Sequence, residues 1–254
     1  MTYTTDTFSL SYELVRDELR HQHVPLLFLH SALGTRKEFD ALQTYYPDRT
    51  LILLDLPSHG ESTTTLSSLR IRDLSNAVHS LLIDHLHIPV VDIIGYSMGG
   101  YTAIDLAIQA PAVVRSIVSH AMKFYWTEQA ISDAMKGLDP AAIKARSEKA
   151  YVALSSLHAA NGFERTAVLA ASIISSFSTE GLSEEAIASM KTPLLLSVGD
   201  SDAMVPPEEV STLYLNLPKE KTFLAIHPNS PHPISRLDLH SFTESVTKFW
   251  RTLL

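Results

Sequence analysis

Ser97 stands in the segment Gly95-Tyr96-Ser97-Met98-Gly99, directly after the apolar run Val90–Ile94 and directly before a helical pattern. This setting is typical of a nucleophilic serine on a sharp turn between a strand and a helix. Glycines two residues before and after the serine fit that turn, because a Cβ there would collide with the neighbouring strand or helix. The Met98 amide, first in the helix, lacks an intrahelical partner and would point at an oxyanion beside Ser97. The local pattern therefore predicts acyl transfer.

A serine nucleophile needs a base, and the base needs a carboxylate that holds its tautomer and supports its charged form. In folds with this turn the acid follows the serine and the histidine follows the acid, each on a loop after a late strand. Asp200 and Asp202 follow one late apolar run, and His227 and His232 follow the next. The required order is met, and the residues alone leave two acids and two histidines as candidates.

The elements that must position these residues alternate along the chain. An alternating segment and six short apolar runs predict strands over Phe8–Leu14, Val24–Leu29, Leu51–Leu54, Val90–Ile94, Val113–Val118, Leu194–Val198 and Thr222–Ile226. Helical patterns cover Lys37–Tyr45, Leu66–His87, Met98–Gln109, Pro207–Leu215 and Leu237–Leu253. This alternation predicts an α/β fold with a mostly parallel, doubly wound sheet, in which ligands bind beyond the carboxyl ends of the strands.

One interval, Lys123–Lys191, breaks the alternation. It contains no strand-like run, but several helical pieces that are separated by glycine and proline. We therefore expect a core made of residues 1–122 and 192–254, with residues 123–191 inserted as a helical lid. The lid begins with the aromatic cluster Phe124-Tyr125-Trp126, which with Met98 and Met122 would suit an apolar acyl pocket or simply the packing of the lid.

The serine turn, the order of the acid and histidine, and the segment Asp55–Ser62 together resemble the α/β-hydrolase superfamily over nearly the whole chain. The resemblance implies that Asp202, three residues before a Val-Pro pair, is the acid and that His232 is the base, although Pro231 replaces the usual glycine. It also implies that the Ala32 and Met98 amides form the oxyanion hole. Asp55 and His59 are then scaffold residues.

The same resemblance implies a carboxylic ester, lactone or thioester as substrate, cleaved through an acyl-enzyme on Ser97. Two alternatives stay open: a carbon–carbon bond hydrolase or pyruvate-eliminating lyase with the same triad, and a ligand-sensing receptor with this fold. Residues beside the nucleophile or at strand ends are candidates for substrate binding, namely His30, Ser31, Tyr96, His120, Phe124 and Trp126.

Composition limits the partners. The 254 residues carry a formal net charge of −8 and no basic cluster, which argues against nucleic acid and anionic membranes as partners. The absence of cysteine excludes disulfides, thiolate zinc sites and cysteine nucleophiles. No phosphate loop or metal-ligand spacing is present, so we expect no cofactor and no metal. The sequence predicts a cytoplasmic protein without membrane insertion that acts on a small molecule, and leaves its oligomeric state open.

Overall fold

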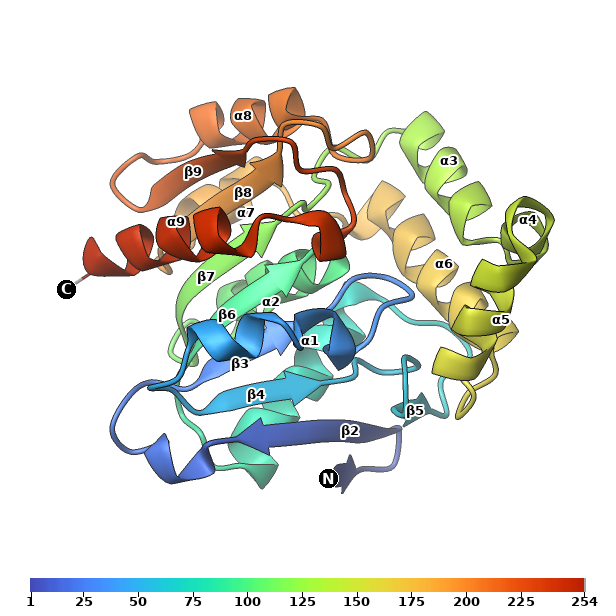
Figure 1. Cartoon of the computed structure of the whole chain (residues 1–254), viewed down its shortest axis with the longest axis horizontal. Coiled ribbons are helices and arrows are strands. Elements are labelled where there is room, and N and C mark those ends of the chain that lie inside the picture. The colour runs from blue at the N-terminus through green and yellow to red at the C-terminus, as the bar shows by residue number, and fades with distance from the viewer. Residues whose placement is uncertain (254) are drawn as a thin grey trace.

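A twisted sheet runs through the middle of the molecule in the computed structural model, which describes residues 1–253 (Figure 1). Its strand order is β1-β2-β4-β3-β6-β7-β8-β9, and the short β5 pairs with β2. The strands are β1 (Thr2–Thr4), β2 (Phe8–Val15), β3 (Leu26–Leu29), β4 (Leu51–Leu54), β5 (Thr63–Thr64), β6 (Val91–Tyr96), β7 (Val114–His120), β8 (Leu194–Gly199) and β9 (Thr222–His227). From β4 to β9 the neighbours are parallel, whereas β2 is antiparallel to its partners. The predicted mostly parallel sheet is confirmed.

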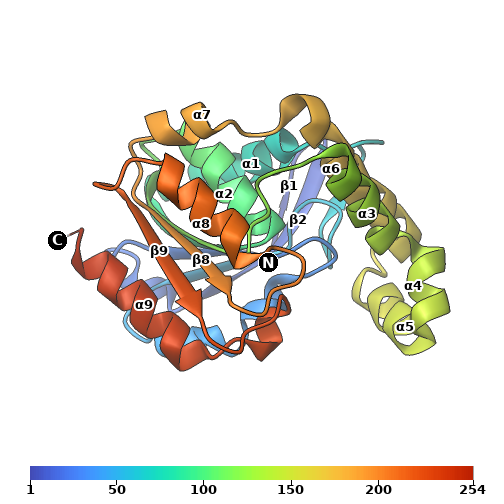
Figure 2. The same cartoon turned by 90° about the horizontal axis from the view of Figure 1, so that it is seen from above.

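Both faces of the sheet are covered, which explains why most positions of the central strands are apolar. In β3, Leu27 and Leu29 pack into one hydrophobic cluster and Leu26 and Phe28 into another, as the two-residue period of a strand requires. The first cluster lies under α1 (Ile71–Ser80), α2 (Met98–Gln109) and α8 (Pro207–Asn216). The second lies under α9 (Leu239–Arg251) and the turns after β3, on the opposite side in Figure 2.

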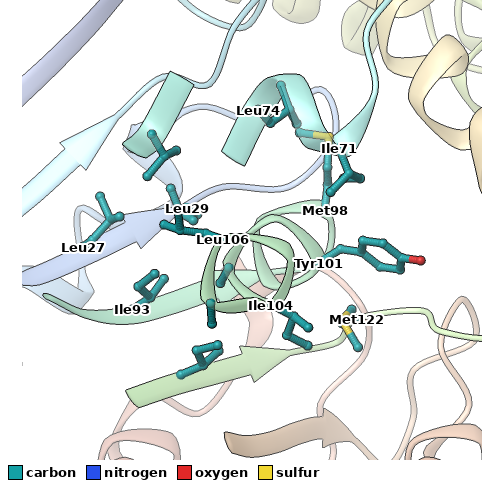
Figure 3. Packing of buried hydrophobic residues seen from close by; sticks show 14 of the residues in the cluster. Leu27, Leu29, Ile71, Leu74, Ile93, Met98, Tyr101, Ile104, Leu106 and Met122 are labelled. Carbon is teal, nitrogen blue, oxygen red and sulfur yellow. The ribbon is translucent and has the colours of Figure 1, made fainter. Parts of the chain in front are cut away.

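Helix α2, which follows the predicted nucleophile, is buried along nearly its whole length. Figure 3 shows Leu106 on the side of this helix that faces Leu29 of β3, Ile104 on the side of Met122, and Met98 extending toward Ile71 of α1. Burying each such side chain stabilises the fold by about 1.5–3 kcal/mol. The element that begins at the nucleophile is therefore fixed by the core.

Two predicted helices are shorter than the pattern indicated. Residues 37–45 form two 3₁₀ turns, Arg36–Phe39 and Leu42–Tyr45, in place of one α-helix, because side chains of the first turn bond to neighbouring loops. The helix predicted from Leu66 begins at Ile71, where the Asp73 carboxylate accepts the Arg70 N–H at 2.8 Å and caps the first turn. It continues as a π-helical turn over Leu81–His85.

The segment between β7 and β8 contains five helices: α3 (Glu128–Leu138), α4 (Pro140–Arg146), α5 (Glu148–Leu157), α6 (Phe163–Glu180) and α7 (Glu184–Ser189). Helices α3 to α6 lie together beside the sheet (Figures 1 and 2). Helices α6 and α7 both contribute to the core cluster of α2, α6 through residues such as Leu169 and Ile173 and α7 through Ile187. No helix within residues 1–253 combines the length and apolarity that crossing a bilayer requires.

Candidate active site

Ser97 lies between β6 and α2 with φ 53° and ψ −115°, a strained conformation for a residue with a side chain. The Ser97 N–H donates to the carbonyl of His120 at 2.8 Å, which ties this turn to the end of β7. A Cβ at Gly95 would meet the backbone of Gly100 at 2.5 Å, and one at Gly99 would overlap the carbonyl oxygen of Leu29 in β3. The predicted need for glycine at both positions is confirmed.

Asp202 and His232 come together although 30 residues separate them, because β8 and β9 are adjacent parallel strands whose loops leave the same edge. The Nδ1–H of His232 donates to Oδ2 of Asp202 at 2.8 Å. The other carboxylate oxygen, Oδ1, accepts the amides of Met204 and Val205 at 2.9 and 2.8 Å. Asp202 is 4% exposed, so these bonds hold a buried carboxylate in one orientation.

His232 has a second support. The hydroxyl of Tyr96 donates to the backbone carbonyl of His232 at 2.7 Å, and the two rings lie 5.4 Å apart. With Nδ1 held by Asp202, the Nε2 of His232 is the basic nitrogen that can take a proton. His232 and Ser97 line the same cavity.

The alternative acid and histidine lie elsewhere. Asp200 is exposed and bonds the neighbouring hydroxyl of Ser201 at 2.7 Å. His227 is 1% exposed, and its Nε2 lies 2.9 Å from Oγ of Ser197, inside the sheet. Burial lowers the pKa of His227 and favours its neutral form. Neither residue lines the cavity that contains Ser97.

Two amides at the cavity are free to bind an oxyanion. The Met98 N–H is the first of α2, and the Ala32 N–H lies in the loop after β3. Neither donates a hydrogen bond to an acceptor within residues 1–253. Both residues line the cavity with Ser97, and the amino-terminal end of α2, where Met98 lies, carries a positive partial charge.

His30 does not line the cavity as expected of a substrate-binding residue. It is fully buried, its Nδ1–H donates to the carbonyl of Ser31 at 2.8 Å, and its Nε2 accepts the Leu56 amide at 2.8 Å. Burial lowers the pKa of His30 to about 3, so the ring stays neutral with one tautomer. It orients the Ser31–Ala32 peptide, which carries the Ala32 N–H.

Two other expected substrate-binding residues are also buried outside the cavity. His120 is 1% exposed and bonds Oγ of Ser197 at 3.0 Å, since its side chain projects from β7 into the core beneath α9. Phe124 is 7% exposed and packs in the core cluster. Ser31, Tyr96 and Trp126 do line the cavity, as expected of substrate contacts.

The cavity has a volume of about 1090 Å³, large enough for a ligand of drug size. The inserted helices supply an apolar wall that includes Trp126, Ile173, Ile174 and Phe177. The opposite wall comes from the loop after His232 and includes Ile234 and Leu237. The sequence analysis missed this second wall. Ile173, Ile174 and Phe177 recur at helical spacing, but that pattern alone does not distinguish a pocket from a core.

The charges at the cavity are balanced. Three basic and three acidic side chains line it: Lys37, Lys123, Arg146, Glu38, Asp40 and Asp133. Lys123 is neutralised by Glu209 of α8 at 2.6 Å. Lys37 and Arg146 have no carboxylate partner in the part of the chain that the structure describes. Across residues 1–253 no three His, Asp or Glu side chains converge as a metal site would require.

Comparison with known proteins agrees with this architecture. The family model described as alpha/beta hydrolase fold matches residues 24–139. The putative 2-succinyl-6-hydroxy-2,4-cyclohexadiene-1-carboxylate synthase of Bacillus subtilis is 32% identical over 107 residues, which are 41% of this chain and 38% of that protein. The 3-oxoadipate enol-lactonase 2 of Acinetobacter baylyi is 35% identical over 96 residues, 37% of this chain and 36% of that protein. The chain spans less than two fifths of the length of these curated relatives.

A solved structure extends the likeness to the whole chain. MGS-M2, an alpha/beta hydrolase enzyme from a deep-sea metagenome library of the Medee basin, superposes with a TM-score of 0.82. The match covers 98% of this chain and 97% of that one, at 18% identity. At this identity the likeness establishes the fold alone.

Proposed function

We propose that this chain is a member of the α/β-hydrolase superfamily and a serine hydrolase that cleaves a carboxylic ester, lactone or thioester through an acyl-enzyme on Ser97. The observation that carries the proposal is the hydrogen bond of 2.8 Å that His232 donates to Asp202, together with the position of His232 on the same cavity as the strained Ser97. A relative named as an enol-lactonase supports the ester-like bond.

In the first half-reaction Nε2 of His232 takes the Ser97 proton while Oγ attacks the carbonyl carbon. The carbonyl oxygen becomes an oxyanion and receives the N–H groups of Ala32 and Met98. Asp202 keeps Nδ1 protonated, so Nε2 is the proton acceptor. The Asp202 carboxylate also stabilises the imidazolium that forms. Collapse of the tetrahedral intermediate expels the alcohol or thiol, to which Nε2–H returns the proton.

In the second half-reaction water replaces the leaving group. His232 takes a proton from that water, and the hydroxide attacks the acyl carbon through a second tetrahedral intermediate. The acid then leaves, and Ser97 recovers its proton from Nε2. The apolar walls favour an acyl or aryl group without charge, because an unpaired charge against them would lose its hydration.

We further propose that residues 123–191 act as the lid of this cavity. Trp126, Ile173 and Phe177 from this segment support that role, since they contribute one wall while the triad belongs to the core. The segment then selects the substrate, and the core performs the chemistry.

The test is labelling and turnover with Ser97→Ala as the matched control. Wild-type protein is treated with a fluorophosphonate and with p-nitrophenyl esters of increasing chain length. We expect a mass adduct on Ser97 and ester hydrolysis, both absent in Ser97→Ala, with both proteins equally folded. Turnover by Ser97→Ala at the wild-type rate would refute the mechanism.

A second candidate, a carbon–carbon hydrolase or lyase with the same triad, is favoured by one observation. Lys37 and Arg146 are cations at the cavity without a carboxylate partner among the described residues, and they could hold an anionic substrate. One relative is named as a 2-succinyl-6-hydroxy-2,4-cyclohexadiene-1-carboxylate synthase. Labelling of Ser97 without turnover of any neutral ester would favour this candidate, and Arg146→Met would then lower activity on anionic substrates.

A further inference from the structure

The oxyanion loop, residues 31–34, carries the Ala32 amide in a conformation that its own backbone does not secure. Leu33 has φ 58°, in the left-handed region that is unfavourable for a leucine. Within the loop, one backbone hydrogen bond joins the Gly34 N–H to the Ser31 carbonyl at 3.0 Å. A strained residue of this kind persists only where surrounding groups hold it.

Glu38 holds the first residue of the loop. Its Oε2 accepts the Ser31 N–H at 2.9 Å, and its Oε1 accepts the Ser31 hydroxyl at 2.7 Å. Burial raises the pKa of Glu38, while the two bonds from Ser31 oppose that shift. Glu38 comes from the 3₁₀ turn Arg36–Phe39 and lines the cavity. Ser31 therefore has a side-chain partner of its own.

His158 holds the other side of the loop, and it comes from the inserted helices. It follows α5, is fully buried, and accepts the Gly60 N–H at Nδ1 over 2.9 Å. A neutral imidazole with Nδ1 as acceptor carries its proton on Nε2, which donates to the carbonyl of Leu33 at 3.0 Å. The ring lies 6.3 Å from that of Phe163 in a stacked arrangement, so its position is fixed by packing.

We propose that Glu38 and His158 are positioning residues that hold the oxyanion loop from both sides, so that the Ala32 N–H points at the oxyanion. This inference rests on the serine-hydrolase function proposed above. Neither side chain takes part in proton transfer. Their effect is geometric, and a donor displaced by about 1 Å lowers a rate by up to about 100-fold. His158 also makes the inserted helices part of the catalytic arrangement.

The experiment compares variants that remove these bonds with variants that replace them. Glu38→Leu and His158→Phe keep side-chain bulk but offer no hydrogen bond. Glu38→Gln and His158→Gln each supply one acceptor and one donor. The Glu38→Gln oxygen can accept the Ser31 N–H while its amide donates to the hydroxyl, and His158→Gln can serve Gly60 and Leu33 in the same way.

We expect kcat for a p-nitrophenyl ester to fall about 10- to 100-fold in Glu38→Leu and His158→Phe, with KM within about twofold of wild type. The two glutamine variants should keep kcat within about fivefold. Affinity for an alkyl trifluoromethyl ketone, which forms a tetrahedral oxyanion on the serine, should fall in step with kcat. Glu220→Gln and His23→Phe, at exposed positions, serve as controls.

The proposal is overturned if folded Glu38→Leu and His158→Phe keep kcat within twofold, if the loss appears in KM alone, or if the glutamine variants lose as much. Wild type and Ser97→Ala in the same assay separate these outcomes from failure of the proposed function, which would leave no serine-dependent turnover to compare. If the apolar variants do not fold, Ser31→Ala and His158→Asn replace them. Ser31→Ala removes one bond to Glu38, and His158→Asn can reach Gly60 but not Leu33. Unchanged kcat in both would equally overturn the proposal.

Discussion

Replacing Asp202 by asparagine is the sharpest test of the proposed triad, because the structure dictates how the new amide must lie. The carboxylate oxygen Oδ1 accepts two backbone amides, those of Met204 and Val205. In Asp202→Asn the amide oxygen must keep that place, since an NH₂ group there would face two donors. The new NH₂ group therefore faces Nδ1 of His232, which must become an acceptor.

The size of the effect follows from the tautomer. With Nδ1 as acceptor, the neutral ring carries its proton on Nε2 and cannot take the Ser97 proton. A tautomer error of this kind lowers kcat by about 10⁴-fold, equivalent to about 5.4 kcal/mol in the barrier. Both backbone hydrogen bonds to residue 202 survive in Asp202→Asn. We therefore expect its melting temperature to fall far less than that of a variant in which the packing of this side chain is also lost.

The assay measures kcat and KM for the best p-nitrophenyl ester, with the melting temperature as a check on folding. Asp200→Asn is the matched control, because Asp200 is exposed and its carboxylate accepts the Ser201 hydroxyl at 2.7 Å and the Ser230 amide at 3.4 Å, bonds that the asparagine oxygen can keep, and we expect kcat within about twofold of wild type. A folded Asp202→Asn with kcat within tenfold of wild type would refute this reasoning. A large loss in Asp200→Asn alone would transfer the role of the acid to Asp200.

Three further predictions concern the fold and the cavity. Gly99→Ala should abolish folded protein or activity, because its Cβ would overlap the Leu29 carbonyl. Gly137→Ala in α3, where a Cβ would have no atom within 4 Å, should raise the free energy of unfolding by up to about 1 kcal/mol. Thermal unfolding of both variants checks the two predictions. Burial lowers the pKa of His30 and His120 to about 3, against about 6.5 when unfolded. The unfolded chain therefore binds more protons than the folded one below pH 6.5. At pH 5.5 each histidine should lower the free energy of unfolding by about 1.4 kcal/mol, which urea unfolding would measure. Equal free energies of unfolding at pH 7.5 and 5.5 would contradict this. Phe177→Ala should move the ester preference toward longer acyl chains, because the ring is part of the cavity wall; an unchanged chain-length profile would place the acyl group elsewhere.

The sheet could be predicted because its central strands are covered on both faces and are therefore apolar at most positions. The prediction placed β4 and α2 at their observed limits, and the fold that the resemblance implied is confirmed. The prediction of one α-helix over residues 37–45 was wrong, because the periodic pattern does not reveal that Glu38 accepts a hydrogen bond from Ser31. Tertiary bonds of this kind override local periodicity.

The cavity was harder to predict than the triad. Ser97, Asp202 and His232 stand at strand ends, where chain order and a parallel sheet already limit their positions. His30 and His120 also follow or end strands, yet both side chains point into the core. This difference was not predicted, because the sequence does not show in which direction a side chain at a strand end points. Glu38 and His158 gave no signal, since Glu38 bonds the amide and hydroxyl of Ser31 and His158 bonds backbone groups up to 125 residues away.

The segment between β7 and β8 leaves and rejoins the sheet on two strands that are hydrogen-bonded neighbours, with Ile117 opposite Leu194. Because the two strands are parallel, the segment runs from the carboxyl end of β7 back to the amino end of β8. Doubling the length of such a connection would add only about 0.6 kcal/mol in closure entropy. The segment can therefore be exchanged, by descent or by laboratory recombination, without disturbing the order of the strands.

Such an exchange has one condition, which comes from His158. A replacement segment that fills the same space but lacks this imidazole would leave the Gly60 N–H and the Leu33 carbonyl without partners. Chimaeras with grafted segments from other hydrolases should therefore fold more often than they retain catalytic activity. Those that supply one acceptor and one donor at the place of His158 should retain the rate while changing the substrate.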